Sequence, residues 1–307
     1  MQANRLLPAA ILIALLGACT GLPTRTLSTP EPSAAPLALV EPTTPAASAL
    51  PPADDNLNAV AWFQTSVEYR LIAGQTWRAA LGQLDRAIKT PRWDALPRED
   101  RPLPMPAGLP LAVIVDIDET VLDNSPYQAR LVRDRVAHGD AAWSDWVGEA
   151  AARPIPGSLE FARAAGARGV TIFYLSNRTV AQGPDTLRNL RQAGFPVAED
   201  SQYLGAGTVV PNCETKGSDK GCRRQMVGRS HRVLMQVGDQ LGDMVSIANN
   251  TPGGREAVVK PYLGWVGERW FVLPNPTYGS WEPALFNNAW SLPAAERRQQ
   301  KLKALRY

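Results

Sequence analysis

Four short apolar runs, each ending at polar or acidic residues, constrain this chain more than any other feature of its sequence. Stretches with helical spacing lie between them. Such alternation of strand and helix predicts an α/β fold in which a mostly parallel sheet is flanked by helices. Reactive groups collect beyond the carboxyl ends of the strands in such sheets, which is where the polar residues of this chain fall. The runs are residues 111–115, 170–175, 233–237 and 270–273.

The segment before the first run is helical in pattern. In residues 56–89, four apolar side chains from Val60 to Leu71 recur at helical spacing. Gly74 predicts either a division of this segment into two helices or a weakened single helix. A proline-rich loop should follow at residues 91–110. Further helices are expected at residues 158–167, 185–193, 223–229 and 241–249.

The amino-terminal residues 1–18 have the pattern of a signal peptide. Arg5 precedes an uncharged stretch, residues 6–18, that is too short to span a bilayer comfortably. Small residues directly before Cys19 resemble the lipobox of bacterial lipoproteins, in which this thiol carries lipid. The alternative is an ordinary signal peptide with a chance cysteine. Thr20 after the cysteine indicates the outer membrane, with the rest of the chain in the periplasm or on the cell surface.

Composition divides the remainder of the chain. Residues 19–54 hold eight prolines and no aromatic side chain, which predicts an extended tether behind the lipid anchor. Residues 55–307 should form the folded domain. Within it we expect a helical addition at 55–110, a core at 111–282 and a basic carboxyl-terminal helix at 283–307.

Charge and histidine content exclude several kinds of function. The formal charge is only +3, and the one basic block lies in residues 294–307, so binding to a nucleic-acid duplex is not indicated. That block predicts a solvated helix or, alternatively, one that contacts anionic lipid headgroups. His138 and His231 are the only histidines, which excludes a histidine-rich metal centre. Carboxylates should therefore carry any catalysis.

Two cysteines remain besides the predicted lipid attachment site. In an exported chain, Cys213 and Cys222 would lie in an oxidising compartment and could pair, closing a ten-residue loop. Free thiols are the alternative. We expect the disulfide.

An acidic pair follows the first apolar run. Asp116 and Asp118 are two residues apart at the end of a predicted strand, so they should point the same way. Two such carboxylates repel each other unless a cation or a shared proton intervenes. A cation that prefers hard oxygen ligands would suit them. The alternative is a pair of strand-end acids that cap the next helix.

The acidic pair opens a series of four motifs. Asp116-x-Asp118-x-Thr120 after an apolar run resembles motif I of the haloacid-dehalogenase-like (HAD) phosphohydrolases. The other motifs follow in order, with Ser176 for motif II, Lys220 for motif III and Gly238-Asp239-x-x-x-Asp243 for motif IV. Longer segments resemble the class C acid phosphatases, which are bacterial outer-membrane lipoproteins that hydrolyse phosphomonoesters, including nucleoside 5′-monophosphates. These segments lie at residues 116–127, 143–146, 155–157, 176–178 and 273–282.

The resemblance implies a HAD-like Rossmannoid core with a smaller helical subdomain and an aspartate-based mechanism. Asp116 would attack phosphorus and form an aspartyl-phosphate. Asp118 would act as the general acid and base. Mg²⁺ would be held by Asp116, the main-chain carbonyl of Asp118 and Asp239. No histidine is needed in this scheme.

The same resemblance assigns the phosphate-binding groups. Ser176, Asn177 and Lys220 would hold the transferring phosphoryl group. Asp243 would support the metal ligands or orient Lys220. Lys216 lies in the same loop and is the alternative for the motif III lysine.

Aromatic residues suggest the substrate. Trp143 and Tyr278 match positions at which the family stacks the base of a nucleotide, and aromatic rings bind any base by its π-face. Core or rim packing is the alternative for both. We expect a lipid-anchored, Mg²⁺-dependent acid phosphatase acting on small phosphomonoesters. The alternatives are a phosphotransferase using the same site and a non-catalytic nucleotide-binding lipoprotein.

Overall fold

The computed structural model describes residues 54–102, 108–215 and 217–307. The predicted signal peptide, the lipid attachment site at Cys19 and the tether up to residue 53 lie outside the described residues, as does Lys216. Within the described part of the chain, no helix combines the length and the apolar character needed to cross a membrane. The described residues all belong to one compact unit.

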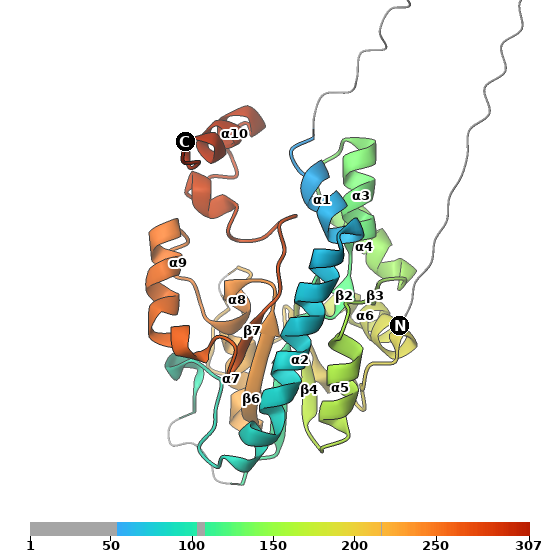
Figure 1. Cartoon of the computed structure of the whole chain (residues 1–307), viewed down its shortest axis with the longest axis vertical. Coiled ribbons are helices and arrows are strands. Elements are labelled where there is room, and N and C mark those ends of the chain that lie inside the picture. Colours follow the sequence, from blue (N-terminus) through green and yellow to red (C-terminus); the bar gives the residue numbers. More distant parts are fainter. Residues whose placement is uncertain (1–53, 103–107, 216) are drawn as a thin grey trace, which may run out of the picture. The chain divides into compact units, whose positions relative to one another are not determined.

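A five-stranded parallel sheet forms the centre of the molecule, in the order β5-β4-β1-β6-β7 (Figure 1). The predicted α/β fold is therefore confirmed, and each of the four apolar runs contains a strand. The strands are β1 (Leu111–Val115), β4 (Thr171–Thr179), β5 (Tyr203–Ala206), β6 (Arg232–Gly238) and β7 (Trp270–Val272). The edge strand β5 was not predicted, because it is only four residues long and contains no β-branched residue.

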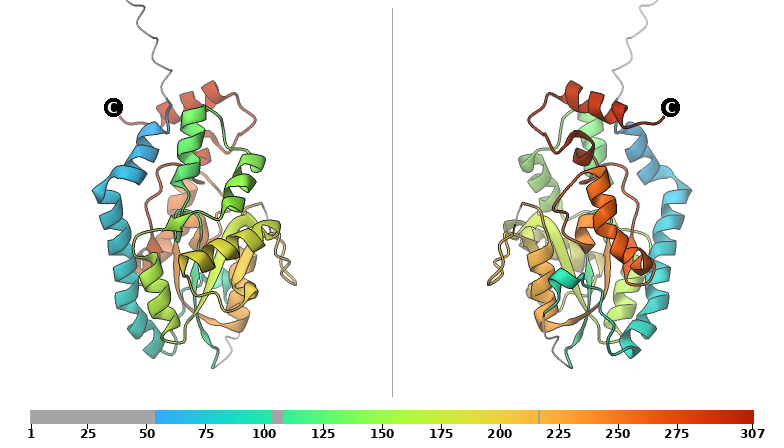
Figure 2. Two further views of the ribbon diagram at one scale, coloured as in Figure 1. Left: turned by 90° about the vertical axis from the view of Figure 1, so that its right-hand side faces the viewer. Right: turned by 90° about the vertical axis from the view of Figure 1, so that its left-hand side faces the viewer.

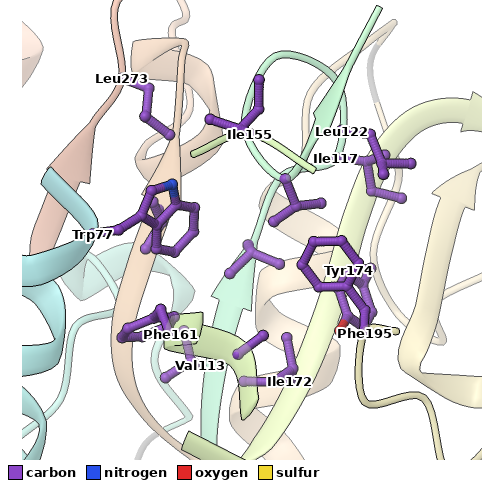
Figure 3. Close-up of a cluster of buried hydrophobic side chains, with 14 of the residues drawn as sticks. Trp77, Val113, Ile117, Leu122, Ile155, Phe161, Ile172, Tyr174, Phe195 and Leu273 are labelled. Carbon is purple, nitrogen blue, oxygen red and sulfur yellow. The ribbon is translucent and has the colours of Figure 1, made fainter. Parts of the chain in front are cut away.

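Alternate residues of β1 face two separate apolar layers. Val113 and Val115 contact a cluster that includes helices from the amino-terminal half of the chain, whereas Ala112 and Ile114 belong to a cluster on the opposite face. The first cluster is covered by α2 (Val67–Lys89), α5 (Ser158–Gly166) and α6 (Gly183–Ala193). The second contains residues of α7 (Gly221–Ser230) and α8 (Leu241–Met244). Figure 3 shows Trp77 and Phe161 packed over strand residues of the first layer.

The helical addition divides at Ser66, and not at Gly74 as the sequence suggested. The structure has α1 (Leu57–Thr65) and α2, with Ser66 between them in extended conformation. The Ser66 hydroxyl accepts a hydrogen bond from the Tyr69 amide at 3.1 Å, which caps α2. Gly74 lies inside α2, and a Cβ added to Gly157, just before α5, would come 2.9 Å from the Cβ of Trp77 and 3.4 Å from the Cα of Gly74.

A small insertion lies between β1 and α5. It comprises β2 (Leu122–Asp123), α3 (Ser125–Asp134), α4 (Asp140–Glu149) and β3 (Arg153–Pro154), and β2 pairs with β3 in antiparallel fashion. The helix expected at 241–249 is shorter, ending at Met244, and α9 (Pro252–Val259) follows it. Short 3₁₀ turns complete the chain at Arg98–Asp100, Val180–Gln182, Asp200–Gln202, Lys260–Trp265 and Pro283–Phe286.

The chain ends in α10 (Ala294–Lys303). Figure 2 shows this helix at the same end of the domain as α1 and the carboxyl-terminal end of α3. Arg298 forms an ion pair with Asp55 at 2.8 Å, so the last helix is tied to the first described residues.

Candidate active site

Parallel neighbouring strands bring the four motifs together. Asp116 follows β1, Ser176 lies in β4 and Asp239 follows β6, and these three strands are adjacent in the sheet. The Asp116 amide still donates to the carbonyl of Val237 at 2.9 Å, so the sheet hydrogen bonding continues to Asp116. Lys220 caps the amino terminus of α7 over the same edge.

Three buried carboxylates form the centre of the site. Carboxylate oxygens of Asp116, Asp239 and Asp243 all lie within 4.8 Å of one another. Burial, together with repulsion from the neighbouring acids, raises the pKa of Asp116 well above its usual range. Burial and the Asp243 carboxylate raise the pKa of Asp239 to about 6.

Among the described residues, one ammonium group, that of Lys220, lies within this cluster. Lys220 donates to the Asp116 carboxylate, to Asp243 Oδ1 at 2.8 Å and to the carbonyl of Leu175 at 2.9 Å. Burial lowers the pKa of Lys220, but the carboxylates of Asp116 and Asp243 raise it by more. The net effect is a raised pKa, so the ammonium form is favoured. One positive charge faces three carboxylates, and hard oxygen donors with excess negative charge fit a divalent cation.

Uncharged donors orient the same carboxylates. Thr120 Oγ1 lies 3.2 Å from Asp116 Oδ2 and 3.3 Å from Asp239 Oδ1. Gln240 and Asn275 each donate a side-chain amide to Asp239 Oδ2 at 2.8 Å. Such donors fix ligand orientation in metal sites. Sequence reasoning gave Gln240 and Asn275 no role, because amides are common in loops.

The Asp118 carboxylate has different partners from Asp116. Ser176 Oγ donates to Asp118 Oδ2 at 2.9 Å, Arg178 contacts Oδ1 at 2.8 Å, and Asn124 donates to Oδ1 at 2.9 Å. Asp118 is not among the three clustered carboxylates. Both acids follow the end of β1 at Val115, so strand alternation does not set the directions of their side chains.

Arg178 is a buried residue to which the sequence gave no separate role. Its guanidinium holds Asp118, donates to Asn124 Oδ1 at 3.1 Å and lies over the ring of Trp143 at 5.4 Å. The Asn177 side chain is exposed and accepts a hydrogen bond from Arg223 at 2.9 Å. The signal available in the sequence was that Arg178 belongs to the segment 176–178, which resembles the class C acid phosphatases.

Glu119 and Tyr278 connect two distant loops. Glu119 has a φ of 59°, in the left-handed region, and its side chain is buried. The Tyr278 hydroxyl donates to Glu119 Oε2, and the Asn124 amide donates to Oε1 at 2.7 Å. Burial and the nearby Asp118 raise the pKa of Glu119 well above its usual range. Sequence reasoning missed Glu119, although it lies within motif I.

The two aromatic candidates lie in different surroundings. Trp143 is half-buried on α4 and packs edge-to-face on Tyr127, with ring centroids 5.1 Å apart. Arg178 lies over the Trp143 ring. Tyr278 follows β7 and is held through its hydroxyl by Glu119. Trp143 therefore contacts Arg178, which pairs with Asp118. Tyr278 contacts Glu119, the residue after Asp118 in motif I.

Cys213 and Cys222 form a disulfide. Cys222 lies two residues after Lys220, within α7, and the bridge connects this helix to the preceding loop. Gly221 stands between them, where an added Cβ would come 2.7 Å from Asp219 Oδ1 and Ser246 Oγ. The tight packing explains a glycine directly after the lysine.

The fold and the site have the arrangement of the HAD type, in which an aspartate follows the first strand and a lysine and acids come from later motifs. The chain belongs to the HAD superfamily, subfamily IIIB (acid phosphatase), whose family model matches residues 64–281. This range includes every described residue of the site.

Solved and curated proteins agree with this membership. The class C acid phosphatase from Bacillus anthracis, in a structure with tungstate bound, is 29% identical with a TM-score of 0.70, covering 82% of this chain and 97% of that one. The stem 31 kDa glycoprotein of Glycine max is 26% identical over 165 residues, 54% of this chain and 58% of that protein. Acid phosphatase 1 of Solanum lycopersicum is also 26% identical over 165 residues, 54% of this chain and 57% of that protein. The chain thus spans less than two thirds of the length of these curated relatives.

Proposed function

We propose that this chain is a Mg²⁺-dependent acid phosphatase that hydrolyses small phosphomonoesters, including nucleoside 5′-monophosphates, through an aspartyl-phosphate. The observation that carries the proposal is the contact of Lys220 with the Asp116 carboxylate beside Asp239 and Asp243, at the carboxyl edge of the sheet. Membership of the acid phosphatase family supports it.

Asp116 is the nucleophile of the proposed reaction. Its carboxylate is held by Lys220 on one oxygen and by Thr120 on the other, which fixes the attacking group. Attack on phosphorus forms an aspartyl-phosphate and divides one difficult displacement into two easier steps. Lys220 neutralises charge on the transferring phosphoryl group. Asp243 keeps the lysine in place through its 2.8 Å contact.

Asp118 moves the proton. It donates to the leaving oxygen in the first step and accepts a proton from the attacking water in the second. Arg178 and Asn124 hold one carboxylate oxygen, and Ser176 contacts the other. When substrate binds, the Ser176 hydroxyl turns to a phosphate oxygen, which frees that side of Asp118. Asn177 contributes a further polar contact to phosphate.

The donor set fits a bound Mg²⁺. Asp116, the main-chain carbonyl of Asp118 and Asp239 would hold the ion, with Asp243 supporting the arrangement. The ion would supply positive charge that offsets repulsion between the nucleophilic carboxylate and the phosphate dianion. The raised pKa values of Asp116 and Asp239, which follow from burial and from repulsion among the acids, agree with a site that needs another cation.

Trp143 and Tyr278 give the site its proposed preference for aromatic leaving groups and nucleotides. Stacking on an aromatic ring contributes about 1–3 kcal/mol per base and tolerates any base. Contacts of Trp143 with Arg178, and of Tyr278 with Glu119, restrain both rings beside the acid–base residue. The preference should therefore be broad.

We further propose that the enzyme is exported and anchored through lipid on Cys19. The uncharged stretch at residues 6–18 and the small residues before the cysteine support this. The disulfide between Cys213 and Cys222 agrees with an oxidising compartment. Placement in the outer membrane rests on Thr20.

Hydrolysis of a chromogenic aryl phosphate by the processed chain tests the proposal. Activity should require Mg²⁺, disappear in EDTA and extend to nucleoside 5′-monophosphates. The Asp116→Asn variant should be inactive, and Asp85→Asn, which alters an exposed ion pair with Arg168, should retain activity. Full activity in Asp116→Asn would overturn the mechanism. Transfer of phosphate to an added alcohol at the expense of water would identify a phosphotransferase instead.

A further inference from the structure

The carboxyl-terminal helix lies outside the region that the phosphatase family model matches. That region ends at residue 281, whereas α10 begins at Ala294. Residues 294–307 contain five basic side chains and one acidic side chain. Neither the catalytic chemistry nor the sheet accounts for this concentration of positive charge.

Specific contacts hold α10 against the domain. Arg298 pairs with Asp55 at 2.8 Å, and Lys301 pairs with Glu282 at 2.9 Å. Arg297 donates to two main-chain carbonyls at 2.8 and 2.9 Å. Arg298 and Lys301 thus hold the helix against the domain, and Arg297 holds it to the turn at Trp290 and Leu292 that precedes it, so any surface that α10 presents moves with the domain.

The other two basic side chains face solvent. Lys303 and Arg306 are exposed and make no hydrogen bond or ion pair with another described residue. An apolar and an aromatic side chain of the same segment are also exposed, with Leu305 57% accessible and Tyr307 fully so. Exposed cations interleaved with aromatic and aliphatic groups are typical of segments that lie in the headgroup region of a membrane.

The position of this surface favours a bilayer over a soluble partner. The ion pair between Arg298 and Asp55 places α10 beside the start of the described chain. Residues 1–53, which carry the proposed lipid attachment site, join the domain there. Figure 2 shows α10 across this end of the domain, beside α1. The exposed cations therefore lie at the same end of the domain as Asp55, close to the residue at which the described chain begins.

We propose that α10 and the last four residues dock the phosphatase domain on an anionic lipid surface. The cations pair with headgroup phosphates, while Leu305 and Tyr307 enter the interface. Docking through α10 holds the domain at the surface with this end toward the membrane.

Vesicle binding by the chain from Thr20 to Tyr307 tests the proposal, since this chain contains the whole compact unit but no lipid. The protein should sediment with vesicles of phosphatidylcholine and phosphatidylglycerol, and not with phosphatidylcholine alone. Each surface cation contributes about 1 kcal/mol, so Lys303→Gln with Arg306→Gln should weaken binding by about 30-fold. The double change to Glu should weaken it further.

A matched control keeps the test specific. Lys89 and Arg92 are exposed near the carboxyl-terminal end of α2, and changing both to Glu alters net charge equally without touching α10. This control should bind as the unchanged protein does. All variants should keep their activity on aryl phosphate in solution, so failure of docking is separate from failure of the proposed catalysis. Equal loss in both double variants, or binding without preference for phosphatidylglycerol, would overturn the proposal.

Discussion

Two buried cations on one helix have opposite surroundings. Lys220 and Arg224 are a single turn apart, and the Arg224 amide donates to the Lys220 carbonyl at 2.9 Å. Both side chains are almost fully buried. Lys220 faces the clustered acids Asp116, Asp239 and Asp243, whereas Arg224 pairs with the single acid Asp100 at 2.6 Å.

The difference separates a reactive site from a structural brace. Arg224 also donates to the carbonyl of Gly242 at 3.0 Å and to Ser246 Oγ at 3.1 Å, so its charge and its donors are satisfied. A buried ion pair of this kind is complete in itself. The Lys220 cluster is short of positive charge, which is costly unless another cation joins it. Imbalance of buried charge therefore marks the functional region better than burial alone.

The largest expected effect is on the reaction. Asp116→Asn should lower kcat on aryl phosphate by about 10⁴-fold or more, because the nucleophile is lost. The same change should not destabilise the metal-free protein, because it removes one of three mutually repelling carboxylates. Kinetics with Mg²⁺ and thermal unfolding in EDTA measure the two effects. A large loss of stability would mean that the Lys220 cluster, like the Arg224–Asp100 ion pair, stabilises the fold.

The Arg224 pair should behave in the opposite way. Arg224→Met leaves Asp100 buried without its partner, which should lower the free energy of unfolding by about 3–5 kcal/mol. The fall in kcat should be far smaller than in Asp116→Asn. Denaturant titration gives the stability, and Arg224→Met with Asp100→Leu should recover most of it. No recovery in the double variant would contradict a self-contained pair.

The disulfide supports the helix that carries both cations. Replacing Cys213 and Cys222 with Ala should lower the free energy of unfolding by about 3 kcal/mol, as the loop-entropy relation gives for a ten-residue loop. Lys220 keeps its contacts with Asp243 and the Leu175 carbonyl, so kcat of the folded protein should change little. A collapse of kcat at preserved stability would show that the bridge positions the lysine directly.

The smallest expected effect is stabilisation by Mg²⁺, which should depend on the acids around Lys220 and not on the acid that pairs with Arg224. Mg²⁺ at about 100 times its dissociation constant should raise the free energy of unfolding by about 2.7 kcal/mol. Asp239→Asn should abolish this gain, since it removes a proposed ligand. Asp100→Asn should retain the gain, although its starting stability is lower. Thermal unfolding with Mg²⁺ and with EDTA gives both values, and an equal gain in the two variants would contradict the assignment.

Local patterns made much of the fold predictable. The four apolar runs contain β1, β4, β6 and β7, because a buried strand needs continuous apolar residues on both faces. The helix break was misplaced, because capping by Ser66 decided it and Gly74 packs inside α2. The edge strand β5 is too short for any pattern to reveal.

The motifs placed the acids in order along the chain, but not the groups around them. Asp100 lies 124 residues before its partner Arg224, and Tyr278 lies 159 residues after Glu119. No spacing rule connects residues so far apart. The contacts of Asp118 with Arg178 also depend on where the chain turns after Val115.

The sequence by itself determined the α/β class and which aspartates end the strands, because periodicity and motif spacing are local properties. Tertiary structure alone decided which of two buried cations has its charge matched by a single carboxylate. Lys220 and Arg224 are equally buried and lie on the same helix, and only the packing of distant loops gives one of them three carboxylates and the other a single partner. Charge balance in a buried site is a sum over neighbours in space, which the order of residues does not contain.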